Sequence, residues 1–462
     1  MSERYESGLG SWGSRWTFIL AATGSAVGLG NIWKFPYMAG ENGGAAFVAI
    51  YLLCLFLVGV PLLMAEVLLG RRGGQNPVGS MAKLTAAAGA SRAWIWTGRL
   101  GALAGFIILS FYSVVGGFSL AYVFNSAFGD FVGAGPEDVA AVFSAVQSSA
   151  VELTGWHTLF LVLVMIVSLR GINQGLEKSL RIIMPMLFIL LAVLLWYAWE
   201  HGDFDQGLAF LFDFSAQKIT WQASLDALGH AFFSLSLGMG VMMAYGAYMP
   251  KSASIGGAVV AIALLDTVVA LSAGLIIFPI VFANGLDPTA GFGLMFNALP
   301  LALGNLPFGH FVGTLFFVLI ALAAWSSAIS ILEPAVAWAQ QRWRCSRTSA
   351  VVVVGCAAWL LGLGTVFSFN IWADATLLGA NFFGWIDFVS SSLMLPIVGL
   401  LVAVFAGWKL DIASRREELA MRRAWVFSSW QWLLKYLVPV AVVAILAISA
   451  WGFVSALQNP FD

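Results

Sequence analysis

Long apolar stretches separated by short polar segments occupy most of the chain. A helix that crosses the hydrocarbon core of a membrane needs about 20 mainly apolar residues, and eleven stretches approach that requirement. The fourth of them is short. They comprise residues 16–38, 45–69, 101–124, 156–169, 182–199, 223–248, 256–282, 311–339, 350–366, 378–408 and 436–456. The pattern predicts an all-α polytopic membrane protein that forms a single transmembrane domain over residues 1–462.

Charge and composition support this interpretation. The chain is 60% hydrophobic and 10% charged, whereas soluble domains carry about 25% charged residues. Lys and Arg collect in the cytoplasmic loops of membrane proteins, and with eleven spans all of them except Lys34 and Lys218 fall on the side of the N-terminus. We therefore expect a cytoplasmic N-terminus and a C-terminus outside. The three cysteines indicate reduced thiols without a disulfide framework.

Two of the spans are interrupted near their middle by glycine-rich segments. The first contains "GSAVGLGN" (residues 24–31) and the sixth contains "SLSLGMGVMM" (residues 234–243). Five spans separate the two breaks, so they lie in units of opposite membrane orientation. Such paired breaks are typical of inverted-repeat transporters with a binding site at the membrane midplane. The expected repeats are residues 12–200 and 221–408, followed by an extra helix at 431–456.

Close helix packing is an alternative explanation for the first break. Gly24 and Gly28 form a GxxxG pair, which usually means only that another helix approaches closely. The second break, at the related position, favours a functional role, because unwound main-chain groups at membrane depth need a buried ion or polar ligand as a partner.

Four segments closely resemble the neurotransmitter:sodium symporter family. They read "WGSRWTFILAATGSAVGLGNIWKFPY" (residues 12–37), "ENGGAAF" (41–47), "FFSLSLGMG" (232–240) and "AAWSSAISILEP" (323–334). The resemblance is greatest to the bacterial hydrophobic amino-acid transporters of the family. It implies a LeuT-type fold with a 5+5 inverted repeat, broken first and sixth helices, and about eleven spans.

The resemblance also implies two sodium sites. One resembles a set formed by the main-chain oxygen of Ala26, the side chains of Asn31, Ser234 and Asp266, and the substrate carboxylate. The other resembles a set formed by the main-chain oxygens of Gly24, Val27 and Ala323 and the hydroxyls of Ser326 and Ser327. Oxygen ligands of these kinds suit a hard cation. Each serine alone would more often be bonded to its own helix.

Asp266 is an acidic residue within the predicted seventh span. Intramembrane acids are costly and usually functional, although a buried polar pair is the structural alternative. Many relatives have Asn here and require chloride, or carry an acid one turn later, where this chain has Ala270. We therefore expect transport without a chloride requirement. With its sodium site empty, the buried Asp266 carboxylate should take up a proton, which suggests proton counter-transport on the return step.

The residues implied at the substrate site favour a neutral amino acid. Amine transporters of the family have Asp at the position of Gly28, and glycine instead leaves room for a substrate carboxylate beside Tyr112. The substrate ammonium would meet carbonyls of Ala26, Phe233 and Ser236. The side-chain pocket resembles Ser25, Ile108, Phe233, Met239, Ser327 and Ile331, with Ser234 nearby. No charged residue is among them, which predicts apolar or aromatic L-amino acids.

The gates show both agreement and departure from the family pattern. The outer gate resembles Lys34 with Asp387, with Phe233 as the lid. The ion pair usual at the inner gate is absent, because its two positions hold Leu9 and Gln341. We expect Arg4, Arg342 or Arg344 to pair with Glu333 near Tyr248 instead, and a larger inward-open population. Glu66 is expected to brace the first helix.

Other classes of function have little support in the sequence. No HExxH, CxxC, GxSxG or P-loop signature is present, so we do not expect an enzyme, and nothing indicates nucleic-acid binding. A sodium channel would need a continuous polar pathway. A non-transporting amino-acid sensor on the same fold is the other alternative. The sequence thus predicts a sodium-coupled amino-acid symporter in a bacterial inner membrane, and leaves open the preferred amino acid, the stoichiometry and the oligomeric state.

Overall fold

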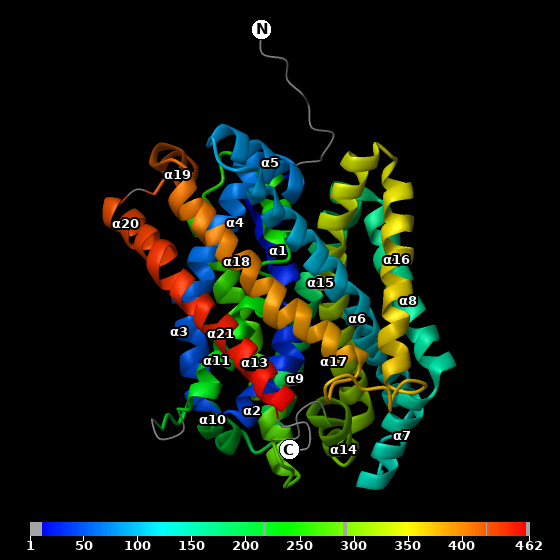
Figure 1. Cartoon of the computed structure of the whole chain (residues 1–462). Coiled ribbons are helices and arrows are strands. Elements are labelled where there is room, and N and C mark those ends of the chain that lie inside the picture. The colour runs from blue at the N-terminus through cyan, green and yellow to red at the C-terminus, as the bar shows by residue number, and fades with distance from the viewer. Residues whose placement is uncertain (1–11, 216–218, 290–292, 422, 459–462) are drawn as a thin grey trace.

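The computed structural model describes residues 12–215, 219–289, 293–421 and 423–458, with residues 451–458 as backbone only. The described part is almost entirely helical, with a single isolated β-bridge between Leu377 and Ala380. The helices run roughly side by side along one axis (Figure 1). Their bounds are α1 Arg15–Ala26, α2 Phe35–Glu41, α3 Ala45–Cys54, α4 Val60–Gly73, α5 Pro77–Ala87, α6 Ile95–Phe128, α7 Pro136–Ser148, α8 Ala150–Leu169, α9 Lys178–His201, α10 Phe204–Phe212, α11 Trp221–Ser234, α12 Val241–Ala247, α13 Ile255–Ala283, α14 Leu299–Gly304, α15 Gly309–Trp343, α16 Arg347–Ser368, α17 Phe382–Asp387, α18 Leu395–Val404, α19 Ile412–Leu419, α20 Ala424–Trp432 and α21 Val438–Gln458.

Nine continuous helical segments among the described residues are long and apolar enough to cross a membrane. They are Ala45–Gly73, Arg92–Phe128, Ala150–Leu169, Ile172–His201, Ile255–Ala283, Gly309–Trp343, Arg347–Ser368, Phe382–Lys409 and Ala424–Ala450. Several of them join two α-helices through a wider helical turn, as Leu55–Gly59 joins α3 to α4. The two broken helices, α1 with α2 and α11 with α12, complete the eleven predicted spans.

The ends of several spans differ from the sequence-based prediction. The fourth is a full-length helix that begins at Ala150, because the hydroxyl of Ser149 caps it by accepting from the Glu152 N–H at 3.2 Å. The tenth begins at Phe382 and not at residue 378, because Leu378 has a positive φ of 54°, which a helix cannot contain.

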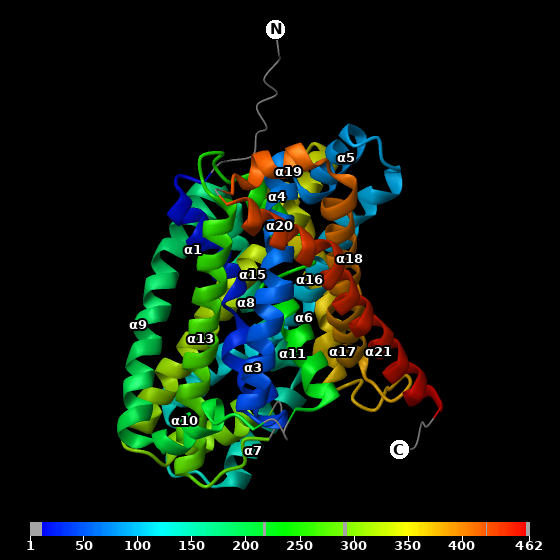
Figure 2. The same ribbon diagram turned by 90° about the vertical axis from the view of Figure 1, so that its left-hand side faces the viewer.

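Short helices lie at the two ends of the bundle. One end, which we call the basic end, carries α5, α19 and the connection between α15 and α16, and α1 begins there (Figure 1). The opposite end carries α7, α10 and α14. The view turned by 90° shows the same division, with α20 and α21 together running from the basic end towards the opposite end (Figure 2). The basic end contains most of the Arg and Lys residues of the loops, including Arg71, Arg92 and Arg347.

The helix breaks have local backbone causes. After Ala26 the chain becomes extended at Val27, with φ −76° and ψ 101°, and helical structure resumes only at Gly30. In the second break Ser236, Gly238 and Gly240 all have positive φ, between 53° and 76°. A right-handed helix cannot pass through three such residues, so α11 ends at Ser234 and α12 begins at Val241.

Small residues on α6 let it pack directly on the second break. A Cβ on Gly101 would lie 3.2 Å from the main-chain nitrogen of Gly240 and 3.3 Å from the carbonyl oxygen of Gly238. A Cβ on Gly105 would lie 3.1 Å from the carbonyl oxygen of Met239. The unwound peptides are therefore held against the backbone of a 34-residue helix, which fixes their position at the centre of the bundle.

Candidate functional site

Asp266 is fully buried in α13 and accepts hydrogen bonds from three side chains of other segments. Asn31 Nδ2 donates to Oδ1 at 2.8 Å, and the Ser234 hydroxyl lies 2.8 Å from both carboxylate oxygens. The Tyr51 hydroxyl donates to Oδ2 at 2.9 Å. These four residues, here called the Asp266 cluster, join both helix breaks to α3 and α13. Their oxygens are of the kind that a hard cation prefers.

The sequence pointed to three of the four members and missed Tyr51. Tyr51 lies in a strongly apolar stretch of α3, where an aromatic residue usually contacts lipid or the core. Its partner Asp266 is 215 positions away along the chain, so no local spacing connects them. Its complete burial, together with a hydroxyl that reaches a carboxylate, is visible only in the folded chain.

A second group of oxygens surrounds the hydroxyl of Ser327. Its Oγ lies 3.3 Å from the carbonyl oxygen of Gly24, 3.0 Å from that of Ser25 and 3.2 Å from that of Val27. The Ser25 carbonyl also accepts from Ser236 Oγ. Two hydroxyl protons thus serve three carbonyls, so acceptors exceed donors in this group, which we call the Ser327 cluster. The carbonyls lie at the C-terminal end of α1, where the helix dipole is negative. The arrangement therefore fits a cation.

Ser326 and Ala323, the other two residues predicted for this site from α15, contact each other. The Ser326 hydroxyl donates to the carbonyl oxygen of Ala323 at 2.9 Å, and both residues are buried in α15. This bond lies within α15, so of the three predicted α15 members only Ser327 is seen to contact the α1 carbonyls among the described residues. Ala26, expected at the first sodium site, is the last residue of α1 and is also buried.

Gly28 lies in the first break, between two hydroxyl groups. A Cβ at this position would lie 2.4 Å from Ser327 Oγ and 2.6 Å from the Tyr112 hydroxyl, so a larger residue does not fit without movement. The neighbouring Leu29 N–H donates to the Tyr112 hydroxyl at 3.1 Å, and the Gly28 N–H donates to Asn31 Oδ1 at 3.2 Å. The break therefore presents main-chain N–H groups beside a tyrosine hydroxyl, a combination that suits a carboxylate ligand.

The two breaks contact each other through a pair of serines. Ser25 Oγ donates to Ser236 Oγ at 3.2 Å, and Ser236 Oγ donates to the carbonyl oxygen of Ser25 at 3.0 Å. The predicted side-chain pocket lies around them. Phe233 is half-buried, and the other members are buried: Ser25, Ile108, Met239, Ser327 and Ile331. Tyr112 and Ser236, predicted to contact the substrate's carboxylate and ammonium, are buried as well.

A cavity of about 210 Å³ lies next to the two helix breaks, on the side away from the basic end. Tyr112, Phe233, Lys34 and Asp387 are among the residues that line it. The Lys34 ammonium lies 4.8 Å from the centre of the Phe233 ring, and the Asp387 carboxylate accepts from Ser391 at 2.7 Å. Lys34 and Asp387 thus face one cavity, but they form no ion pair in the part of the chain that the structure describes.

The basic end is closed over the site by Trp12. Its N–H donates to the carbonyl oxygen of Tyr248 and its indole Nε1 donates to that of Tyr245, both at 3.1 Å. The Trp12 ring packs edge-on against both tyrosine rings, with centroids 5.1 and 6.1 Å away. Trp12 is 2% exposed, so its side chain is almost fully enclosed. The structure is therefore closed towards the basic end, with the cavity on the opposite side.

Two of the three predicted partners of Glu333, Arg342 and Arg344, were wrong. Arg347 makes the ion pair, with Nη2 2.6 Å from Oε2, and neither Arg342 nor Arg344 forms one among the described residues. The reason is the turn after α15: Arg344 takes a left-handed conformation, and α16 then begins at Arg347 and returns over Glu333. Arg4 lies outside the described residues.

Tyr248 and Ser168 also take part in this pair. The Tyr248 hydroxyl donates to Glu333 Oε1 at 3.2 Å, and Arg347 Nε donates to the carbonyl oxygen of Ser168 at 2.7 Å. Tyr248 therefore connects the ion pair to the closure by Trp12. Gln341, the position at which the family has an acid, instead accepts a hydrogen bond from the Asn76 side chain. Leu9 lies outside the described residues.

The sequence predicts that Glu66 braces the first helix. In the structure its side chain instead bonds to the second break. Its Oε1 accepts from the Gly238 N–H at 2.7 Å, and it is 1% exposed. Gly238 has a φ of +76°, so its N–H points away from any helical partner. The glutamate of α4 thus supplies the acceptor that the unwound backbone lacks.

Two interrupted helices that meet at the centre of a bundle, with ion-type oxygen clusters at the breaks, define a class of secondary transporter with discontinuous helices. The comparisons name the family. The family model described as "Sodium:neurotransmitter symporter family" matches residues 9–132 and 142–461. The chain belongs to the sodium:neurotransmitter symporter family, whose members are transporters and not enzymes.

Individual relatives agree. The chain is 36% identical over 440 residues to the sodium-dependent transporter YhdH of Bacillus subtilis, covering 94% of this chain and 96% of the relative. It is 30% identical over 442 residues to a sodium-dependent transporter of Haemophilus influenzae, covering 94% and 97% of the two chains. Among solved structures, MhsT in complex with L-phenylalanine matches with a TM-score of 0.89 and 39% identity, over 96% of this chain and all of that chain. The predicted LeuT-type fold is confirmed.

Proposed function

We propose that this protein is a symporter that couples sodium entry to the uptake of neutral apolar or aromatic L-amino acids by alternating access. The observation that carries the proposal is the Ser327 cluster, in which carbonyl oxygens of Gly24, Ser25 and Val27 outnumber the donors available to them. A monovalent cation satisfies such a group without a buried countercharge.

Each cluster has a role in this scheme. Asn31, Ser234 and Asp266, with the carbonyl of Ala26 and the substrate carboxylate, bind the first sodium ion. The second ion is bound by the set Gly24, Val27, Ala323, Ser326 and Ser327. Tyr51 holds the Asp266 carboxylate in place through its hydrogen bond of 2.9 Å. The negative charge of Asp266 replaces the anion that other family members obtain from chloride, so we propose chloride-independent transport.

The proposed substrate lies at the breaks. Its carboxylate accepts hydrogen bonds from the N–H groups beside Gly28 and from the Tyr112 hydroxyl. A Cβ at Gly28 would lie too close to its neighbours, so there is no room at this position for an amine-binding Asp. Its ammonium meets carbonyls of Ala26, Phe233 and Ser236. Ser25, Ile108, Met239, Ser327 and Ile331 surround its side chain, and none of these residues is charged. The similarity to MhsT, whose structure contains L-phenylalanine, supports an apolar or aromatic substrate.

Alternating access requires closure on each side in turn. We propose that Phe233 closes over the substrate when Lys34 and Asp387 approach each other across the cavity that both line. At the basic end, Trp12 and the Glu333–Arg347 pair provide the inner closure. Charge placement supports a cytoplasmic basic end and a C-terminus outside, and we propose a bacterial inner membrane as the location. The repeats proposed at residues 12–200 and 221–408 account for the paired breaks.

The driving force suffices for concentrative uptake. One charge crossing 100 mV is worth about 2.3 kcal/mol, so two sodium ions contribute roughly 4.6 kcal/mol from the potential alone. At about 1.4 kcal/mol for each tenfold step, this supports accumulation of a zwitterion on the order of 10³-fold.

Uptake of radiolabelled neutral amino acids into proteoliposomes, with and without an inward sodium gradient, tests the proposal beside Asp266→Ala. Accumulation that needs both sodium and Asp266 is the expected result. Sodium-dependent binding without accumulation would instead indicate an amino-acid sensor. Sodium flux without substrate would indicate a channel, and either result would overturn the symporter.

A further inference from the structure

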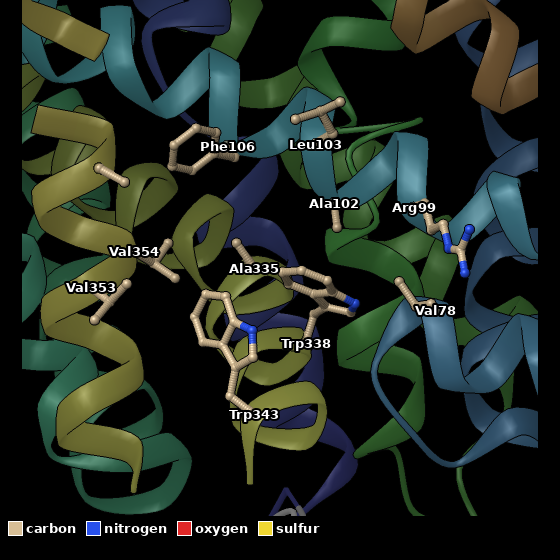
Figure 3. A pocket seen from close by; sticks show the side chains of 11 residues that line it. Val78, Arg99, Ala102, Leu103, Phe106, Ala335, Trp338, Trp343, Val353 and Val354 are labelled. Atoms are coloured by element: carbon tan, nitrogen blue, oxygen red, sulfur yellow. The ribbon is translucent and has the colours of Figure 1, made fainter. Parts of the chain in front are cut away.

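A second cavity, separate from the helix breaks, opens on the side of the bundle. It has a volume of about 360 Å³ and lies between α6, the last turns of α15 and the first turns of α16. Figure 3 shows its lining, which includes Leu103, Phe106, Trp338, Trp343 and Val353 around an open centre. Apart from Arg99, every side chain of this lining is apolar or aromatic. We call it the lateral cavity.

The lateral cavity faces outward from the helices and not into the transport site. Leu103, Trp343 and Val353 are 47%, 50% and 51% exposed, although each belongs to a membrane-spanning helix. In a membrane, exposed apolar surface of this kind is in contact with the hydrocarbon chains of lipids. The natural occupant of the lateral cavity is therefore an apolar chain and not a water-soluble molecule.

A single cation marks one end of the lateral cavity. Arg99 lies on the side towards the basic end, and Phe106 lies seven residues further along α6, about 10 Å deeper at 1.5 Å per residue. The Arg99 guanidinium lies 5.0 Å from the Trp96 ring and makes no ion pair with a carboxylate of the described residues. Arg342 and Arg344, exposed beside Trp343, also make none.

From this arrangement we propose that the lateral cavity is a binding site for an anionic phospholipid, with one acyl chain between α6, α15 and α16 and its phosphate at Arg99. Basic pockets between membrane helices on the cytoplasmic side favour anionic headgroups. The cavity is complementary to a phospholipid along its length. Arg99, towards the basic end, faces the phosphate, and the apolar wall that extends inward from Arg99 faces the acyl chain.

A lipid in this position would hold three helices together. On its opposite face α6 carries Gly101 and Gly105, which contact the second break, and α15 carries Ile331 of the predicted substrate pocket. An acyl chain between α6, α15 and α16 fills space that would otherwise weaken their packing. Binding of a ligand to the folded state raises its stability, so the bound lipid should raise the melting temperature.

Native mass spectrometry of the full-length protein in detergent, with equal amounts of dioleoyl phosphatidylglycerol and dioleoyl phosphatidylcholine, tests the site. The wild type should retain one phosphatidylglycerol in preference to phosphatidylcholine. One basic residue near the membrane surface strengthens the binding of an anionic lipid about five-fold. Arg99→Gln should therefore lower the preference for phosphatidylglycerol by about this factor. Arg92→Gln is the matched control, because Arg92 is exposed at the basic end and does not line the lateral cavity.

A steric variant separates headgroup from chain recognition. Ala357 is exposed and lines the lateral cavity, so Ala357→Phe should fill it and remove the retained lipid while leaving the lipid-free melting temperature unchanged. Equal retention of the two lipids by the wild type would overturn the proposal. Equal loss in Arg92→Gln and Arg99→Gln, or no loss in Ala357→Phe, would also overturn it. The wild type could instead form a dimer without bound lipid, and Ala357→Phe could dissociate that dimer. This result would show that a second copy of the protein covers the lateral cavity, and it would overturn the lipid proposal.

Discussion

Oε2 of Glu333 lies 2.6 Å from Nη2 of Arg347, and Oε1 accepts a second bond from Nη1 at 3.1 Å. The glutamate is fully buried and the arginine side chain is 18% exposed. This forked pair joins α15 to α16 and, through Tyr248, reaches the second half of the broken sixth helix. Under the proposed mechanism it takes the place of the inner ion pair that Leu9 and Gln341 cannot form.

Replacing Arg347 should loosen the inner closure. Removing one partner of a buried pair costs about 3–5 kcal/mol, because the other charge remains buried and unpaired. Arg347→Ala should therefore speed amide hydrogen exchange in α1 and α12, measured by mass spectrometry, and lower substrate accumulation. Arg342→Ala, which removes an exposed arginine without an ion pair among the described residues, should leave both unchanged. Unaltered exchange in Arg347→Ala would contradict this role for the pair.

Ser327→Ala should weaken sodium activation. It removes the hydroxyl at the centre of the carbonyls of Gly24, Ser25 and Val27, and loss of one ligand should raise the sodium concentration for half-maximal uptake about tenfold or more, which is about 1.4 kcal/mol. Ser330→Ala is the control, because that buried serine, three residues further along α15, donates to the Ser326 carbonyl of its own helix at 3.0 Å. A similar sodium response in the two variants would exclude Ser327 as a ligand.

Tyr51→Phe tests the residue that only the folded chain reveals. Loss of its hydrogen bond leaves Asp266 with one donor fewer, and an unmade buried bond costs about 1–3 kcal/mol. We expect lower thermal stability together with weaker sodium activation of uptake. Tyr122→Phe removes an equally buried bond, to the carbonyl of Phe296 at 2.9 Å, and should reduce stability alone. If the two variants change sodium activation equally, Tyr51 has only a structural role.

Gly28→Ala should abolish substrate binding. The added methyl would lie 2.4 Å from Ser327 Oγ and 2.6 Å from the Tyr112 hydroxyl, so the break must shift. Overpacking of this kind costs about 1–3 kcal/mol, and binding assays with labelled substrate should show the loss. Gly155→Ala in α8 has open space around the new atom and should bind normally. Normal binding by Gly28→Ala would show that the carboxylate lies elsewhere.

Replacing chloride by gluconate should leave uptake unchanged in the wild type, because in the proposed first sodium site Asp266 supplies the negative charge. Asp266→Asn removes that charge while keeping the shape of the side chain. Uptake by this variant should fall at least tenfold, as expected when about 1.4 kcal/mol of ion binding is lost. Sodium-driven uptake by the wild type and by Asp266→Asn should be measured in both chloride and gluconate. Loss of wild-type uptake in gluconate would refute the prediction that transport does not need chloride.

The parts of the site that the sequence predicted are those encoded by short local patterns. The breaks follow from glycines inside apolar spans, and Ser327 follows from a serine pair in a recognisable segment. Arg347 could not be chosen over Arg342 or Arg344, because a single left-handed residue at the end of α15 decides which arginine returns to Glu333. Tyr51 and the partner of Glu66 likewise depend on contacts between segments far apart in the chain.

The contact of Gly101 and Gly105 with the second break has a consequence for the evolution of specificity. It is made between backbone atoms, and a Cβ added at Gly101 or Gly105 would lie 3.1–3.3 Å from the unwound peptides, so that they would have to shift by a few tenths of an ångström. The groups that would hold an amino acid by its shared carboxylate and ammonium are then inherited as a fixed frame. Divergence is left to the few side chains that project into the pocket, such as Met239 and Ile331, so relatives can exchange one amino acid for another without rebuilding the centre of the molecule.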